Sequence, residues 1–318
     1  MDNIAHTLLG VTLANAGLSK RWGRGTTATL VIASNLPDVD ALWAMTQSPG
    51  AFLMRRMLTH SIVGVPLLAL AAAWLLKFRY KNLSWKTLIG LTLLGLAGHL
   101  FYDLLNSYGV VLLYPFSHHR FELAWVFIVD LFFWGIPLAP FLLLIPLKRW
   151  ISLERLSQIA LGALGLYIGL CGWGRLQGER LLEQTIQREK WTPGFTYVFP
   201  EALGCHRFRG LVKENETYRM VLLHVFQHRA DVKMVVTTDE TNPAVEAVKQ
   251  TPFIQKLLWF AKAPVWHVEY APTSENSPRQ PSIREIQLYD LRFNSLVLNR
   301  GGRHFIFRFD SQGNQLPS

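Results

Sequence analysis

The sequence predicts a mostly α-helical membrane domain followed by a small soluble domain of the α+β or β-rich class. Half of the 318 residues are hydrophobic, and they concentrate before about residue 173, whereas the charged residues concentrate after it. Several early apolar runs approach the roughly 20 residues that a helix needs to cross a bilayer. We therefore expect a membrane domain at 1–173, an amphipathic linker helix at 174–192 and a soluble domain at 193–318.

The charge pattern favours a membrane protein over a nucleic-acid-binding one. The net charge is +10, but the basic residues gather at the ends of apolar segments, where membrane proteins need them. Only two cysteines occur, too few for a disulfide framework. The basic loops after Lys77 and after Lys148 favour the cytoplasmic side, which would place the C-terminal domain outside. Arg55 and Arg56 lie on the opposite side and weaken this orientation.

The first part of the chain is predicted to hold about four spans, preceded by embedded helices. Asp2 or Asn3 can cap a helix that runs to about Leu18 and is too short to span. A second apolar segment, Thr26–Ser34, follows it. The four expected spans are Ile62–Phe78, Leu88–Val111, Leu123–Leu147 and Ile159–Trp173.

Beyond residue 193 the apolar pattern changes to short β-rich runs, and two short helices are expected, from Asn242 and over Phe253–Lys262. The expected strands are Tyr218–Phe226, Val232–Thr238, Arg284–Leu291, Ser295–Asn299 and His304–Phe309.

Two ionisable residues, His99 and Asp103, stand near the middle of the Leu88–Val111 apolar segment. Their spacing of four residues places both side chains on one face of a helix. A carboxylate at this depth is costly unless it is paired or bound to metal, so both residues are candidates for a functional site. The alternative is a buried His–Asp hydrogen bond that only holds helices together.

A second signal is the hexapeptide Asn35–Asp40, with sequence Asn-Leu-Pro-Asp-Val-Asp. The proline should push Leu36 out of helical geometry and start a new helix. Asp38 and Asp40 would then lie in its first turn, about 200° apart around the axis. Only one of them could face a given site directly. An ordinary capped turn would give the same pattern.

His6, His60, His118 and His119 add to the acidic residues of the membrane domain, and Glu122 repeats the four-residue spacing after His118. Histidine and carboxylate side chains are the ligands of zinc and related divalent ions. Metal binding would also neutralise carboxylates that are costly in lipid. The combination predicts a polynuclear metal site.

Several motifs resemble the membrane-bound metal-dependent hydrolases of the YdjM/YfhP type. The resemblance covers roughly residues 1–150. That family is distantly related to zinc-dependent phospholipase C and to the P1-type nucleases. The matching segments are residues 1–10, Asn35–Asp40, Thr59–Ser61, Gly98–Asp103, Pro115–Ser117 and Phe127–Asp130.

The resemblance implies a divalent metal, zinc above all, and a phosphoester substrate that is derived from lipid if the site opens at the membrane. The implied ligands are His6, Asp38, His60, His99 and Asp103. His118, His119 and Glu122 remain secondary candidates.

The remaining roles in this hypothesis follow from side-chain chemistry. Asp40 or Asp130 could orient the attacking water or accept its proton. Arg55, Arg56 or Arg120 could hold a phosphate by a bidentate contact.

Two alternatives remain open at this point. One is an ion transporter in which the His and Asp residues mark a path through the bilayer. The other is a non-catalytic membrane protein in which they lock helices together. Membrane lipid is an expected partner in each case, and nucleic acid in none.

Overall fold

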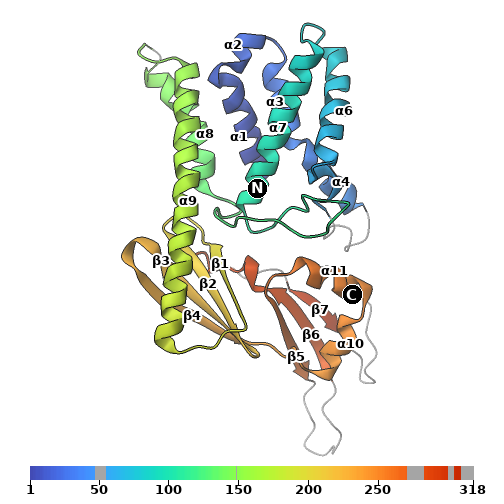
Figure 1. Ribbon diagram of the computed structural model, residues 1–318, viewed down its shortest axis with the longest axis vertical. Helices are drawn as coiled ribbons and strands as arrows, with labels where there is room; N and C mark the ends of the chain where they lie inside the picture. The colour runs from blue at the N-terminus through green and yellow to red at the C-terminus, as the bar shows by residue number, and fades with distance from the viewer. Residues whose placement is uncertain (47–54, 148, 271–282, 300–303, 309–318) are drawn as a thin grey trace, which may run out of the picture. The chain divides into compact units, whose positions relative to one another are not determined.

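The structure is a computed structural model that describes residues 1–46, 55–147, 149–270, 283–299 and 304–308 (Figure 1). The chain divides into two compact units. The first comprises Met1–Gly178 with Phe199–Phe208, and the second comprises Glu179–Val198 with Arg209–Ser318.

The first unit is helical. Its elements are α1 (Asn3–Leu13), the π-helical turn η1 (Ala14–Leu18), α2 (Ser19–Trp22), α3 (Thr26–Asn35), the 3-10 turn η2 (Leu36–Asp38), α4 (Val39–Met45), the 3-10 turn η3 (Leu58–His60), α6 (Gly64–Arg79), α7 (Trp85–Leu105), α8 (Leu131–Leu147) and the start of α9 (Leu153–Glu189).

Helix α3 packs against both α1 and α7, and α6 packs against α7 and also contacts α3 (Figure 1). Two glycines allow this close approach. A Cβ on Gly10 of α1 would lie 3.0 Å from the carbonyl oxygen of Leu30, and one on Gly95 of α7 would lie 2.6 Å from the Cβ of Ala33. The three helices therefore meet backbone to backbone, as small residues allow in membrane bundles.

The expectation of about four spans is wrong. Among the described residues, only α7, with 21 residues, and α9, with 37, are long and apolar enough to cross a membrane. The α6 and α8 helices are apolar but have 16 and 17 residues. Helix α7 ends at Leu105 because the backbone N–H groups of Leu123, Trp125 and Val126 donate to its last carbonyls, 2.7–3.0 Å away. The apolar residues after Leu123 therefore cap α7 and do not extend α8.

Asp130 sets the start of α8. Its Oδ1 accepts hydrogen bonds from the backbone N–H groups of Phe132 and Phe133, 2.9 and 3.0 Å away. The next helix, α9, continues unbroken past Trp173, where the sequence predicted the last span to end. Residues 174–189 are helical throughout, so the charged segment that was expected as a separate linker helix is the continuation of the apolar part of α9.

Within the described ranges, the β-structure consists of two sheets. The first has the order β1 (Phe195–Pro200), β2 (Arg207–Glu214), β3 (Thr217–His224), β4 (Arg229–Thr237), and the second has the order β5 (Pro264–Tyr270), β6 (Ile283–Asp290), β7 (Phe305–Arg308). The pairs β3–β4, β5–β6 and β6–β7 are antiparallel. Two helices, α10 (Pro243–Lys249) and α11 (Pro252–Phe260), lie between β4 and β5 in the chain.

Both short helices and four of the five strands were predicted close to their observed positions. The prediction of a strand at Ser295–Asn299 is wrong, because these residues form a turn in which Ser295 Oγ accepts from the N–H of Leu298 at 3.0 Å.

Candidate metal centre

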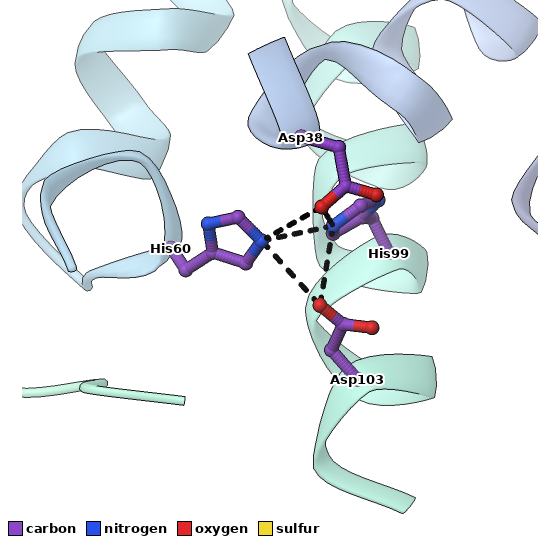
Figure 2. Close-up of side chains that lie close together, drawn as sticks. All are labelled: Asp38, His60, His99 and Asp103. Carbon is purple, nitrogen blue, oxygen red and sulfur yellow. Dashed lines mark hydrogen bonds and ion pairs between the residues drawn. The ribbon is translucent and has the colours of Figure 1, made fainter. Parts of the chain in front are cut away.

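Four side chains from three separate segments meet in the helical unit (Figure 2). Asp38 comes from η2, His60 from η3, and His99 with Asp103 from α7. One ligand atom from each side chain lies within 4.8 Å of the other three.

Local geometry explains why these residues meet. His99 and Asp103 are one turn apart on α7, so they share a face. They lie in its last two turns, because α7 ends at Leu105, and so they lie toward its C-terminal end and not at its middle. Asp38 ends a 3-10 turn that continues α3. Leu36 keeps helical angles, φ −60° and ψ −38°, which contradicts the expectation that Pro37 would force it out of the helix.

The turn that carries His60 is equally tight. The hydroxyl of Ser61 accepts a hydrogen bond from the N–H of Gly64 at 2.9 Å and closes the turn before α6. A Cβ on Gly64 would lie only 1.7 Å from the carbonyl oxygen of Leu58, so this backbone approach requires glycine.

The separations between the four ligand atoms are those of a compact coordination site. The Nε2 atoms of His60 and His99 are 3.1 Å apart. Asp103 Oδ2 lies 3.4 and 3.5 Å from them, and Asp38 Oδ1 lies 3.7 and 3.9 Å from them. Ligands at roughly 2.0–2.2 Å from a tetrahedral ion are about 3.3–3.6 Å from one another. The observed arrangement is close to that spacing.

Hydrogen bonds on the far side of each imidazole fix which nitrogen faces the centre. His99 Nδ1 lies 2.7 Å from the carbonyl oxygen of Ser34, which only accepts, so Nδ1 carries the hydrogen. His60 Nδ1 lies 2.8 Å from the hydroxyl oxygen of Thr59. A carboxylate, backbone carbonyl or water behind the ring is the usual support of a metal-binding histidine, and the hydroxyl of Thr59 takes that place behind His60. Both Nε2 atoms can then direct lone pairs inward.

The two carboxylate oxygens that face the centre complete the fit. Asp38 Oδ1 and Asp103 Oδ2 are buried and make no hydrogen bond within the described part of the chain. Buried polar atoms without a hydrogen bond are rare, because each costs about 1–3 kcal/mol, and Asp103 Oδ2 has an ion pair with Arg56 in place of one. Two nitrogen lone pairs and two carboxylate oxygens without a hydrogen bond converge on one point, and this donor set suits a divalent cation.

Positive groups already surround Asp103. The guanidinium Nη1 of Arg56 lies 3.1 Å from its Oδ2, and the amine of Met1 donates to its Oδ1. Burial opposes the ionisation of Asp38, but the neighbouring imidazoles and the guanidinium of Arg56 hold its pKa well below the usual range. Asp38 is therefore ionised and ready to bind a cation.

His6 adjoins the centre without belonging to the group of four. Its ring stacks on that of His99, with centroids 3.8 Å apart, and its Nε2 lies 3.5 Å from Asp103 Oδ1. Both of its ring nitrogens are buried and have no hydrogen-bond partner among the described residues. Burial lowers the pKa of His6 to about 4, so the ring is neutral and offers a lone pair.

The two carboxylates expected to act on water lie elsewhere. Asp40 Oδ2 is 3.7 Å from His60 Nδ1, the ring nitrogen that faces away from the centre. Asp130 caps α8, and its Oδ2 accepts a hydrogen bond from the hydroxyl of Tyr167 at 2.8 Å.

The three arginines expected to bind substrate surround one tyrosine, Tyr108, with guanidinium carbons 4.7–5.7 Å from its ring centre. Arg55 Nε also donates to the hydroxyl of Tyr108 at 2.9 Å, and Arg120 donates to the carbonyls of Gly109 and Arg55. Of the three, Arg56 has the ion pair with Asp103.

The secondary candidates lie in the connection between α7 and α8. The ring of His118 contacts Tyr114, and that of His119 contacts Phe121. Glu122 lies beside Gly109. These three residues are not in the group of four ligands.

Sequence reasoning missed Thr59, Tyr108 and the carbonyl of Ser34 as parts of this centre. Thr59 alone had a signal, since it directly precedes His60.

Comparison with known proteins identifies the family. The family model described as YdjM inner membrane protein matches residues 1–178, more than half of the chain. The search of curated proteins and the search of solved structures each found no match. The matched region contains all four residues of the cluster, the whole of α7 and the part of α9 up to residue 178. The chain therefore belongs to the YdjM family of inner membrane proteins.

Proposed function

We propose that this protein is a membrane-bound, metal-dependent hydrolase that cleaves a phosphoester. The observation that supports this proposal is the convergence of four side chains, which bring two inward-facing imidazole nitrogens and two carboxylate oxygens without a hydrogen bond to one point: Asp38, His60, His99 and Asp103. Such a mixed donor set is typical of zinc and similar ions. A divalent ion held there would supply a Lewis acid that lowers the pKa of a bound water and polarises a phosphoryl oxygen.

Among the four side chains of the centre, that of Asp38 is the most accessible to solvent. Its side chain is 10% exposed, whereas those of His60, His99 and Asp103 are fully buried. The second oxygen of Asp38 accepts a hydrogen bond from Asn3 at 3.4 Å, which orients the carboxylate. We propose that substrate reaches the centre past Asp38.

Arg56 is the residue proposed to hold the phosphoryl group. Its side chain is almost fully buried, and its Nε has no hydrogen-bond partner among the described residues. An arginine fork suits phosphate oxygens, and a buried guanidinium has little competition from water. Asp40 and Asp130 accept hydrogen bonds from other protein groups, so this proposal gives them no role as general base.

A substrate carried by lipid fits the surroundings. His99 and Asp103 lie near the end of α7, which is long and apolar enough to cross a membrane. Helix α4, which directly follows Asp38, exposes Leu42 and Trp43, each about two-thirds accessible. An apolar exposed face with tryptophan is typical of a membrane interface.

A non-catalytic role is the second candidate. Asp103 already has ion pairs with Arg56 and the amine of Met1, so the protein can neutralise this carboxylate without metal. In that case the cluster would hold η2, η3 and α7 together.

Metal content separates the two candidates. Detergent-purified wild type, His99→Ala and Asp38→Ala are analysed by inductively coupled plasma mass spectrometry, with gel filtration as a check of folding. A hydrolase retains stoichiometric zinc-like metal in the wild type, loses it in both folded variants, and cleaves chromogenic phosphodiesters only when metal is bound. A wild type that binds no divalent metal, under conditions that do not strip it, would contradict the hydrolase proposal and favour the non-catalytic role.

A further inference from the structure

We propose that Asp40 and Thr59 are positioning residues that fix the tautomer of His60, so that its Nε2 is free to bind metal. This inference rests on the proposed metal centre. It assigns a function to two side chains that lie behind a ligand and do not themselves face the ion.

A chain of short contacts leads from Asp40 to His60. The hydroxyl of Thr59 lies 2.8 Å from Asp40 Oδ2 and 2.8 Å from His60 Nδ1. The backbone N–H of Arg56 donates to the same Asp40 oxygen at 2.8 Å. Asp40 is therefore anchored from two sides.

The single hydrogen of the Thr59 hydroxyl decides the direction of both bonds. A carboxylate has no hydrogen to donate, so Thr59 must donate to Asp40. Thr59 then has only lone pairs left for His60, and His60 Nδ1 must carry the hydrogen of that contact. The remaining nitrogen, Nε2, is the one that lies 3.1 Å from Nε2 of His99.

The geometry also argues against Asp40 as a direct ligand. Its Oδ2 is 3.7 Å from Nδ1 of His60, whereas the ligand oxygens of Asp38 and Asp103 are 3.7 and 3.4 Å from Nε2. The two nitrogens lie on opposite sides of the imidazole. Asp38 and Asp40, two residues apart on consecutive helical turns, thus serve opposite sides of the same ring.

The two histidines differ in how their tautomers are set. His99 relies on a backbone carbonyl, that of Ser34, which no substitution removes. His60 relies on two replaceable side chains. Loss of a supporting partner behind a metal ligand typically costs about 10- to 100-fold in metal affinity. His60 is therefore the ligand whose support can be tested by mutation.

The test measures zinc affinity by chelator competition in full-length, detergent-purified protein, and the visible absorption spectrum of the cobalt-substituted protein. Thr59→Val keeps the shape of threonine but removes the hydroxyl, whereas Thr59→Ser keeps the hydroxyl. Asp40→Asn keeps the size of aspartate but adds an amide that can donate to the Thr59 hydroxyl. Thr59 would then be free to donate to His60 Nδ1, which would reverse both hydrogen bonds. Thr12→Val removes a buried hydroxyl of α1 that donates to the carbonyl of Leu8 at 2.7 Å, and serves as the matched control.

We expect Thr59→Val and Asp40→Asn to bind zinc about 10- to 100-fold more weakly and to alter the cobalt spectrum. Thr59→Ser and Thr12→Val should keep wild-type affinity and spectrum. If Asp40→Asn does not fold, Thr59→Val decides the question, because it leaves Asp40 and its bond to Arg56 in place.

Two unfavourable results are distinguishable. Wild-type affinity and an unchanged cobalt spectrum in Thr59→Val would overturn the positioning role while leaving the metal centre intact. A wild type that binds neither zinc nor cobalt would overturn the metal centre and this inference with it.

Discussion

The guanidinium of Arg56 lies 3.1 Å from Oδ2 of Asp103, the same carboxylate oxygen that faces His60 and His99. A fixed positive charge thus stands at the edge of the proposed metal centre. Its neighbour Arg55 is directed to the ring and hydroxyl of Tyr108. The two adjacent arginines therefore have different surroundings and are expected to differ in function.

Replacement of Arg56 should weaken the binding of substrate more than the binding of metal. A hydrogen bond to a charged group contributes about 1.5–3 kcal/mol, which corresponds to roughly 10- to 100-fold. We expect Arg56→Gln to raise KM for a phosphodiester by that factor while the metal content stays unchanged. Steady-state kinetics on metal-analysed protein provide the measurement. Arg55→Gln is the paired variant, and an equal rise of KM in both would contradict a specific role for Arg56.

His6→Phe tests whether His6 contributes a nitrogen or only a ring. Phenylalanine retains an aromatic face to stack on His99 but has no nitrogen to place near Asp103. Because both nitrogens of His6 are buried without hydrogen-bond partners among the described residues, we expect His6→Phe to bind less metal than the wild type. Mass spectrometry of the purified variant measures this directly. Full metal content in His6→Phe would make His6 a packing residue.

Replacement of Gly95 by alanine, which adds only a Cβ, should destabilise the helical unit. A Cβ there would lie 2.6 Å from the Cβ of Ala33, so Gly95→Ala must push α3 and α7 apart. Overpacking of this kind costs about 1–3 kcal/mol. Gly90 is on the same helix, and a Cβ there would meet no atom within 4 Å. Thermal unfolding in detergent should therefore show a lower Tm for Gly95→Ala and no loss for Gly90→Ala.

Low pH should weaken the hydrogen bonds that the Glu214 carboxylate accepts in the second unit. The carboxylate of Glu214 accepts hydrogen bonds from the hydroxyl and the backbone N–H of Thr192, 2.6 and 2.9 Å away, and from Arg219. These bonds lower its pKa from 4.5 to about 2. A lowered pKa stabilises the folded state fully above pH 4.5, and this contribution disappears as the pH falls toward 2.

Glu214→Gln should remove that pH dependence. The effect is small, because the site is accessible to solvent. Trp191 lies 5.1 Å from the guanidinium of Arg219, so its fluorescence can follow the contact as the pH is lowered. Identical acid profiles for the wild type and Glu214→Gln would contradict the assignment.

The sequence could predict those parts of the centre that depend on local geometry. The four-residue spacing of His99 and Asp103 determines a shared helix face whatever the rest of the chain does. The two-residue spacing of Asp38 and Asp40 likewise separates their directions, and in the structure Asp38 belongs to the four-residue group whereas Asp40 lies behind His60, on its Nδ1 side. Both results follow from helix periodicity alone.

The remaining features depend on contacts between distant segments. The ends of the spans could not be read from hydropathy, because Leu123 and Trp125 are apolar yet cap α7 through their backbone N–H groups. Strand β2 was missed because five consecutive residues are buried, which removes the alternation typical of a half-exposed strand. Thr59 was missed as a positioning residue because its place directly before His60 does not show that its hydroxyl contacts both Asp40 and the His60 ring.

The order of the four residues of the proposed metal centre along the chain has a thermodynamic consequence. Residues 38, 60, 99 and 103 belong to three segments, and 21 and 38 residues separate the successive segments in the sequence. An ion bound by all three would close two loops at once, as a pair of cross-links does, and would favour the folded bundle over the unfolded chain by mass action. Chelators would then act on this protein as denaturants of its helical unit, and metal supply would set how long the folded bundle persists in the membrane.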